Sequence, residues 1–195
     1  MVTQARPIDA KYVTIGEFEQ MSEFNGPYEL INGVIVKKMA GDNHDRIARK
    51  IDRAIEKLDP DDNLGRTWRT GTFKLASGTD DARDNGRMPD LAYIIADRVP
   101  PLSDESMTVA PDLVVEVWSP GDVNALVNLR STRNKMEYWP EHGVKITWCV
   151  NPAAKEVEVL YSDNSKPAMI YEIGDTLDGE DVIPGFKMAV ADLFV

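Results

Sequence analysis

Two stretches of the chain have apolar residues at the spacing of one helical face. In residues 43–58 an isoleucine returns at every fourth position, which predicts an amphipathic helix. Residues 123–139 predict a second helix with a less regular apolar pattern. Near the N-terminus, Thr14 is followed three positions later by Glu17, a capping-box pattern that predicts a short helix over residues 14–21.

Short apolar runs between these helices predict β-strands. The dipeptide at 32–33, Asn-Gly, joins the runs at 28–31 and 34–36, and it predicts a hairpin because both turn residues need a positive φ. Further strands are predicted at residues 67–69, 72–75, 91–95, 113–118, 145–150, 156–161 and 169–173. The polar stretch at 76–87 predicts a loop.

This order of elements predicts a mixed α/β (α+β) fold. We expect a sheet protein with an N-terminal hairpin. The 195 residues contain no internal repeat and no Gly/Ser linker. We therefore expect one domain over residues 1–195, with residues 1–13 as a flexible N-terminal tail.

The composition excludes several classes of protein. The 22 Lys and Arg stand against 33 Asp and Glu, and the formal net charge of −11 counts against tight non-specific binding to nucleic acid. The single cysteine, Cys149, cannot form an intramolecular disulfide, and two histidines are too few for a His-rich metal site. No apolar run could span a bilayer and the first residues do not form a signal peptide, so we expect a cytoplasmic protein without a membrane partner.

Two acidic residues lie where a metal site would need them. Glu116 lies within the apolar run 113–118, which predicts a central strand, and a carboxylate buried there is costly unless it is paired, protonated or bound to a metal. Asp90 follows Pro89 at the start of the strand predicted at 91–95. If the two strands are neighbours, the carboxylates converge and can hold Mg²⁺ or Mn²⁺. The alternatives are a satisfied glutamate on a wet strand face and an ordinary strand-entry aspartate.

The helix predicted at 43–58 has two further features. His44 falls on its apolar side and is expected to point inward, as a satisfied core histidine or as a functional one. The opposite side carries a basic stripe of Arg46, Lys50, Arg53 and Lys57. A solvated helix face and a surface that tracks nucleic-acid phosphates explain this stripe equally well.

Lys135 is the last candidate. In metal-dependent hydrolysis of phosphodiesters, a lysine near the metal orients the attacking water and balances the developing charge. The usual Glu-X-Lys pattern places that lysine two residues after Glu116, where this chain has Trp118. Taken alone, Lys135 is an ordinary surface lysine.

Several short motifs follow one another in a fixed order. They are residues 28–34 (YELINGV), His44 opening a helix, residues 87–90 (RMPD), residues 111–120 (PDLVVEVWSP), Lys135, residues 143–144 (GV), residues 148–152 (WCVNP) and residues 183–186 (IPGF). In this order they resemble the Uma-type family of putative restriction endonucleases, formerly a domain of unknown function. That family belongs to the PD-(D/E)XK nuclease-like superfamily, and the resemblance extends from about Thr14 to Phe194.

The resemblance implies a restriction-endonuclease-like fold, with a central mixed β-sheet flanked by helices. It also implies a DNA endonuclease that depends on Mg²⁺ or Mn²⁺. Asp90 and Glu116 match the two metal-binding acidic positions of the family. Lys135 matches the helix lysine that replaces the lysine of Glu-X-Lys. Glu29 and His44 match positions near the site, where we expect an outer-shell role for the former and a proton shuttle or phosphate contact for the latter.

The chain departs from the family pattern around Lys135. Trp139 occupies the position where the family usually has tyrosine, and residues 146–148 read Ile-Thr-Trp in place of Glu-Tyr-Trp. Residues 129–134 lack the acidic residue that commonly comes shortly before the lysine. These departures leave the two metal-binding positions intact.

Three functional hypotheses follow. The first is a metal-dependent endonuclease that hydrolyses phosphodiester bonds in DNA. The alternative is a catalytically silent binding or assembly module that keeps the nuclease fold, which suits the acidic net charge and the altered lysine helix. A small-molecule hydrolase with the same acidic pair ranks last. We also expect a homodimer, with exposed strand edges and with Trp139 and Trp148 as interface aromatics.

Overall fold

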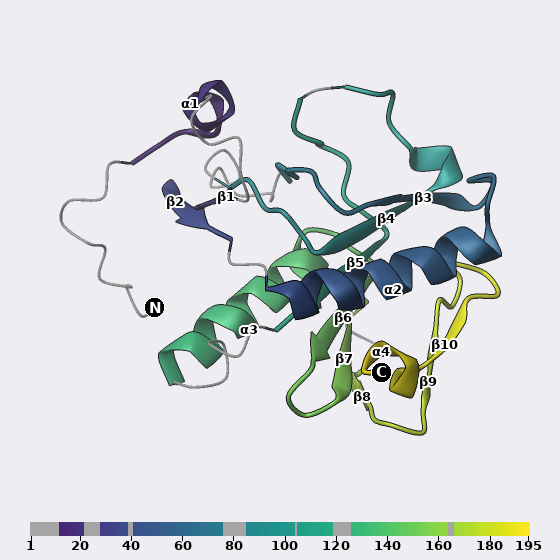
Figure 1. The fold of residues 1–195 in the computed structure, drawn as a ribbon. Helices are drawn as coiled ribbons and strands as arrows, with labels where there is room; N and C mark the ends of the chain where they lie inside the picture. The colour runs from purple at the N-terminus through teal and green to yellow at the C-terminus, as the bar shows by residue number, and fades with distance from the viewer. Residues whose placement is uncertain are drawn as a thin grey trace.

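The computed structural model describes most of the chain (Figure 1). The described residues are 12–21, 28–38, 41–75, 85–103, 105–118, 126–163 and 166–195, without the side chains of residues 126–132. Nearly all of the tail predicted at 1–13 and most of the loop predicted at 76–87 lie outside the described residues. The same is true of the first residues of the helix predicted at 123–139.

A six-stranded mixed sheet forms the centre of the fold, with the strand order β3-β4-β5-β6-β7-β8. The strands are β3 (Gly65–Trp68), β4 (Leu91–Ile95), β5 (Leu113–Val117), β6 (Ile146–Asn151), β7 (Glu156–Tyr161) and β8 (Met169–Tyr171). β5 and β6 are parallel, and all other neighbours in this sheet are antiparallel. A parallel pair needs a crossover connection, which here contains α3 (Leu126–Glu141).

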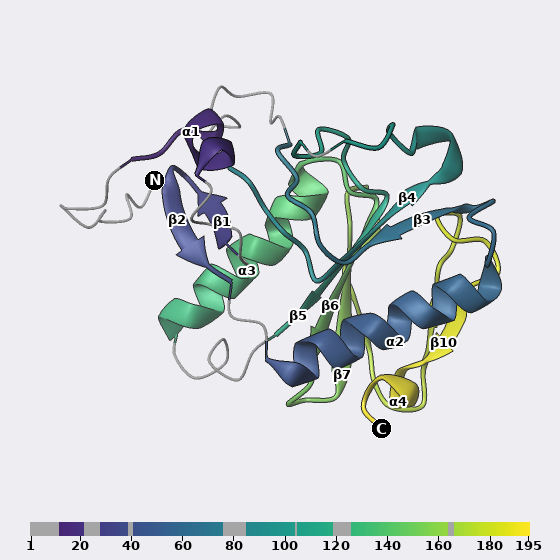
Figure 2. The same ribbon diagram turned by 45° about the horizontal axis from the view of Figure 1, so that its top comes forward.

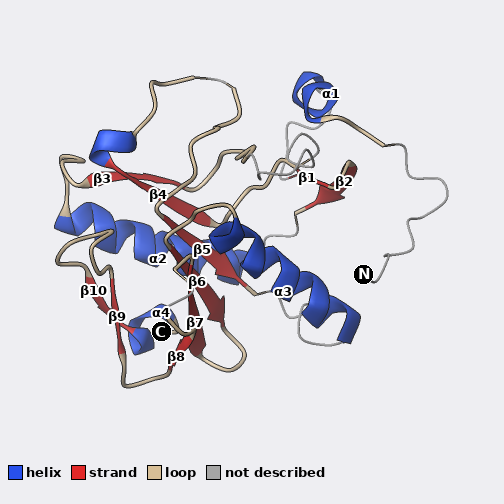
Figure 3. Cartoon of the chain, turned by 180° about the vertical axis from the view of Figure 1, so that it is seen from behind, coloured by secondary structure: helices blue, strands red, loops and turns tan. Residues whose placement is uncertain are grey.

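Helices cover both faces of this sheet, as predicted. α2 (Asp42–Leu58) and the short α4 (Val190–Leu193) lie over one face, and α3 lies over the other (Figure 2, Figure 3). Because successive side chains of a strand alternate between faces, Leu113 and every second residue after it pack toward α2, and Glu116 faces α3. In the part of the chain that the structure describes, no helix has the length and apolar character to cross a membrane.

A hairpin of β1 (Tyr28–Ile31) and β2 (Val34–Lys37) forms a separate two-stranded sheet beside the body (Figure 2). The turn predicted at 32–33 is confirmed, and its two residues have φ values of 49° and 75°. Leu30 attaches the hairpin to the body, because its side chain is fully buried and its backbone pairs with Gly86. The hairpin therefore has a defined position relative to the sheet.

Four short elements complete the described fold. They are α1 (Ile15–Gln20), the 3₁₀ helix η3 (Ala96–Arg98), β9 (Thr176–Asp178) and β10 (Lys187–Ala189). β9 and β10 pair with each other antiparallel. At α1 the predicted capping box is confirmed: the Thr14 hydroxyl accepts from the Glu17 N–H at 3.2 Å, and the Thr14 N–H donates to the Glu17 carboxylate at 2.9 Å.

One predicted strand is reduced to a single paired residue. Of the strand expected at 72–75, only Phe73 pairs, through isolated bridges to Arg87 and Met107. Phe73 is fully buried on the α3 side of the sheet. The apolar residues at 72–75 therefore reflect packing into the core and not a strand that pairs along its length.

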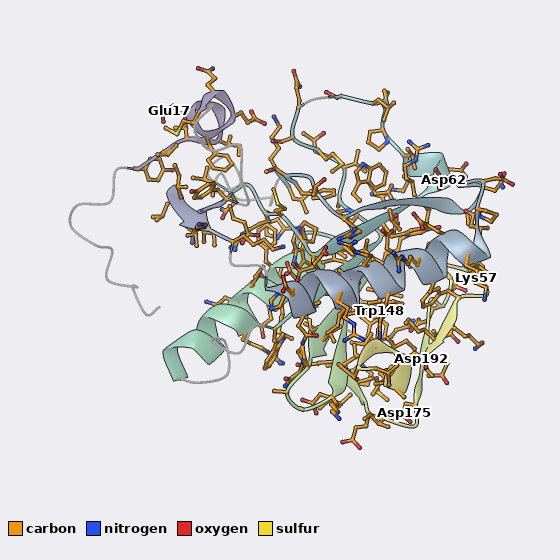
Figure 4. The ribbon with its side chains drawn as sticks, in the orientation of Figure 1. Glu17, Lys57, Asp62, Trp148, Asp175 and Asp192 are labelled. Carbon is orange, nitrogen blue, oxygen red and sulfur yellow. The ribbon has the colours of Figure 1, made fainter. Side chains whose placement is uncertain are left out.

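Trp139 and Trp148 are core residues, so the interpretation of them as interface aromatics is wrong. Their exposed fractions are 0% and 1%. On the α3 side, Trp139 meets Phe73 edge-on with 6.3 Å between the ring centroids. On the α2 side, Trp148 packs against Phe186 with 5.6 Å between the ring centroids. Figure 4 labels Trp148 next to α2 near the middle of the view, whereas Glu17, Asp62 and Asp175 lie near its periphery. A homodimer has no support from these two side chains.

We expect Gly33→Ala to loosen the hairpin. Alanine at φ 75° is strained by about 1 kcal/mol or more, and its Cβ would lie 2.3 Å from the Tyr12 ring. Hydrogen exchange of the amides in residues 28–38 should become faster. Gly16→Ala in α1 is the control, because nothing lies within 4 Å of the added Cβ. Equal exchange of the hairpin amides in both variants would contradict this role of Gly33.

Candidate active site

The two acidic residues that were expected to converge face each other across one strand pair. β4 and β5 are antiparallel with Leu91 opposite Val115, so the next step of the register places Asp90 opposite Glu116. The backbone of β5 holds Asp90 in place. Its N–H donates to the Val115 carbonyl at 3.1 Å, and its Oδ2 accepts from the Val117 N–H at 2.7 Å. The Asp90 and Glu116 side chains are only 7% and 4% exposed.

α3 brings Lys135 to this pair. Lys135 Nζ lies 2.9 Å from Glu116 Oε2 and 3.8 Å from Glu29 Oε2. Trp139 follows one turn later on the same helix face, and its indole N–H donates to Glu116 Oε1 at 2.9 Å. Each oxygen of Glu116 therefore has a partner on α3. At the position where the family usually has tyrosine, this chain places a hydrogen-bond donor to the buried carboxylate.

Trp118 fills the space that the lysine of a Glu-X-Lys pattern would occupy. It lies two residues after Glu116, on the same side of the strand, and packs against Met136, Cys149 and Leu160. The cation therefore reaches the carboxylate from the facing helix and not from the strand itself.

The hairpin adds two charged groups to the cluster. Glu29 of β1 is 5% exposed, and its Oε1 accepts from the Met88 N–H at 2.9 Å. Lys38, directly after β2, has its Nζ 2.8 Å from Asp90 Oδ1 and donates to the Met88 carbonyl. Lys38 was not among the predicted site residues. In the sequence nothing distinguishes it from Lys37, which is exposed.

His44 lies at the edge of the cluster and is buried, as predicted. Its Nδ1 is 3.9 Å from Asp90 Oδ2, which is beyond hydrogen-bond distance. A cavity of about 180 Å³ adjoins these groups, and its lining includes Lys38, His44, Arg69, Met88 and Asp90. This cavity lies on the side of Asp90 that faces α2.

The charges of the cluster shift the pKa values of its acids in opposite directions. Burial raises the pKa of Asp90, but Lys38 and Lys135 outweigh burial and hold this pKa below its ordinary value. Burial raises the pKa of Glu116 above its ordinary value, and Asp90 and Glu29 add to this against the effect of the lysines. Burial alone would lower the pKa of Lys135, but the carboxylates around it raise it well above its ordinary value. Asp90 is therefore ionised, and Lys135 protonated, at neutral pH.

The basic stripe of α2 divides into two parts. Arg46 and Lys50 donate to backbone carbonyls within residues 192–195, so they hold the C-terminal segment against α2. Arg53 and Lys57 are exposed, and Lys57 lies at the end of α2 remote from the acidic cluster (Figure 4). The structure does not bring the stripe into the cluster, and its role in binding nucleic acid stays a prediction.

The oxygen donors of this cluster fit a hard divalent cation. Asp90 and Glu116 offer carboxylate oxygens, the ligands that Mg²⁺ and Mn²⁺ prefer. Among the described residues, no three acidic, histidine or cysteine side chains are grouped so that they could hold an ion. Mg²⁺ does not need such a cage, since one or two carboxylates usually hold it, with water and substrate phosphate as further ligands.

The fold is that of a restriction-endonuclease-like protein: a mixed sheet between helices, with an acidic pair on neighbouring strands and a lysine on the crossover helix. Residues 15–191 match the Uma2 family, which is described as "Putative restriction endonuclease". The chain belongs to this family, as the sequence motifs predicted.

A solved structure supports the fold class. The crystal structure of a putative nuclease belonging to DUF820 from Anabaena variabilis ATCC 29413 has a TM-score of 0.75 to this chain. The match covers 93% of this chain and 97% of the other, at 19% sequence identity. A comparison with curated proteins found no match. The predicted restriction-endonuclease-like fold is thus confirmed.

We expect unequal effects on stability from neutralising the two acids. Asp90→Asn removes a charge that the fold favours, so the free energy of unfolding at pH 7 should fall. Glu116→Gln removes a charge that burial disfavours, but it also takes from Lys135 its partner at 2.9 Å, so this free energy should fall less than in Asp90→Asn. Unfolding in urea without divalent metal measures both. An equal loss in the two variants would contradict these pKa directions.

The pH dependence follows from the lowered pKa of Asp90. The contribution of the Asp90 carboxylate to stability is fully present above the pKa of this group in the unfolded chain, near 3.8. It is lost as the pH falls through the lower pKa of the folded state. The difference in unfolding free energy between the wild type and Asp90→Asn should therefore shrink in acid.

We expect Trp139→Phe to destabilise the protein more than Trp148→Phe. Both variants remove part of a buried indole, but only the first leaves Glu116 Oε1 without its donor. A hydrogen bond to a charged group contributes about 1.5–3 kcal/mol. The difference between the two urea-unfolding free energies should fall in this range. Equal losses would mean that the indole N–H adds nothing beyond packing.

Proposed function

We propose that this protein is a metal-dependent endonuclease that hydrolyses phosphodiester bonds in DNA. The observation that carries the proposal is the convergence of Asp90, Glu116 and Lys135 in one buried cluster. Ion pairs that only stabilise a fold also bury charges, but they need no more than one acid and one base. Here two carboxylates face each other across neighbouring strands, with a third, Glu29, beside them.

Asp90 and Glu116 would hold Mg²⁺ or Mn²⁺, because they present the oxygen donors that these ions require. When bound, such an ion supplies a water of lowered pKa and neutralises charge on the scissile phosphate. Glu29 would act from outside the ligand set, since its carboxylate is directed to the Met88 N–H and to Lys135.

Lys135 serves as a fixed positive charge and not as a general base. Its raised pKa keeps the ammonium protonated at neutral pH, so it has no free lone pair with which to take a proton from water. A protonated lysine beside the carboxylates can orient the attacking water and stabilise the negative charge that develops on the phosphate. The neighbouring Glu116 holds the ammonium in position at 2.9 Å.

His44 is the candidate for proton transfer. It is buried next to Asp90 and lines the cavity of about 180 Å³. An imidazole there can pass a proton between the site and solvent, or contact a substrate phosphate that enters the cavity. The net charge of −11 predicts weak binding to DNA that weakens further as salt is added.

Plasmid cleavage in Mg²⁺ or Mn²⁺ tests the proposal. We expect Asp90→Asn and Glu116→Gln to lose at least about 100-fold in rate, because each removes a metal-binding charge. Lys135→Met should lose about 10²–10³-fold, the effect of removing one group that stabilises transition-state charge. Glu56→Gln, which alters an exposed acid on α2, is the matched control and should cleave like the wild type.

Equal cleavage by all these variants would assign the activity to a contaminant and overturn the site. Folded wild-type protein that neither cleaves DNA nor takes up Mn²⁺ in calorimetry would favour the alternative, a silent binding or assembly module.

A further inference from the structure

Lys38 occupies a position that a metal ion would need. Its ammonium lies 2.8 Å from Asp90 Oδ1, and its side chain is 9% exposed. The other oxygen of Asp90 accepts from the Val117 N–H. The two oxygens of Glu116 are taken by Lys135 and Trp139. Every oxygen of the acidic pair thus has a partner, and a metal ion has to displace at least one of them.

The contacts of these partners differ, and they indicate which one is the easiest to displace. The Val117 N–H belongs to the backbone of a central strand, and the Trp139 indole is fully buried. Lys135 is shared between Glu116 and Glu29, so it retains a carboxylate if one is taken. Lys38, in contrast, follows the last residue of a hairpin strand and pairs with Asp90 alone among the carboxylates described. It also donates to the Met88 carbonyl, a neutral acceptor that it would give up on leaving.

There is also room for Lys38 to move. Its side chain lines the cavity of about 180 Å³ next to Asp90 and His44. A flexible four-carbon side chain can turn into this space without a change in the hairpin backbone. Electrostatics favour the move, because an ammonium and a divalent cation on one carboxylate repel each other.

We infer that Lys38 is a built-in counter-ion that a divalent metal ion must displace from Asp90, and that it thereby sets how tightly the site binds metal. This inference rests on the proposed metal-dependent function. It gives Lys38 a role in the affinity of metal binding, distinct from the charge-stabilising role of Lys135.

Calorimetric titration with Mn²⁺ tests the inference. Lys38→Met should bind Mn²⁺ with a Kd about tenfold lower than the wild type, because no ammonium has to be displaced; tenfold corresponds to about 1.4 kcal/mol. Lys37→Met is the matched control. It removes the same charge from the exposed neighbouring residue and should keep a Kd close to that of the wild type. A Kd for Lys38→Met that is equal to or higher than that of the wild type overturns the inference.

A second measurement uses the wild-type protein, so it does not depend on the folding of a variant. An amine-reactive label, quantified by mass spectrometry, should modify Lys38 slowly without metal and faster in saturating Mg²⁺, with Lys37 as internal reference. Unchanged labelling of Lys38 while Mg²⁺ binds would overturn the inference alone. If neither the wild type nor Lys38→Met binds Mn²⁺, the proposed function itself fails, and the inference fails with it.

Discussion

The constraint on which this structure depends is the burial of three carboxylates in one place. Asp90, Glu116 and Glu29 are each at most 7% exposed, and like charges buried together are costly unless opposite charges lie beside them. Lys135 and Lys38 meet this need. Since the first comes from the crossover helix and the second from the hairpin, the cluster also joins both elements to the central sheet. The contacts that compensate the buried charges are thus also contacts that hold the helix and the hairpin against the sheet.

Much of this arrangement was predictable because it follows from local rules. The turn at 32–33 needs a positive φ at two residues, which Asn-Gly tolerates. The apolar run around Glu116 indicated a strand buried on both faces, and all five residues of β5 are buried. Once the strand that begins after Asp90 was taken as its neighbour, the alternation of side chains brought the two acids together. The helical spacing placed His44 on the inner face of its helix, and the family resemblance added Glu29 and marked Lys135 and His44 as site residues.

What could not be predicted depends on which faces meet in three dimensions. Lys38 and Lys37 are chemically identical neighbours, and only the docking of the hairpin decides which one reaches Asp90. The departure from the family pattern at Trp139 left the lysine helix open to doubt. In the structure its indole N–H satisfies the carboxylate that Lys135 also holds. Trp148 was assigned to a surface because aromatic residues suit interfaces and cores alike, and composition cannot separate the two.

The hydrogen bond from Trp139 to Glu116 has a spectroscopic consequence. An indole that donates to a buried carboxylate fluoresces according to the charge and distance of that acceptor. A change in the charge or position of Glu116 therefore alters the environment of Trp139. This indole is fully buried, and its nitrogen lies 2.9 Å from Glu116 Oε1. The emission of Trp139 would therefore respond to the charge and position of Glu116, on top of the emission of the three other tryptophans of the chain.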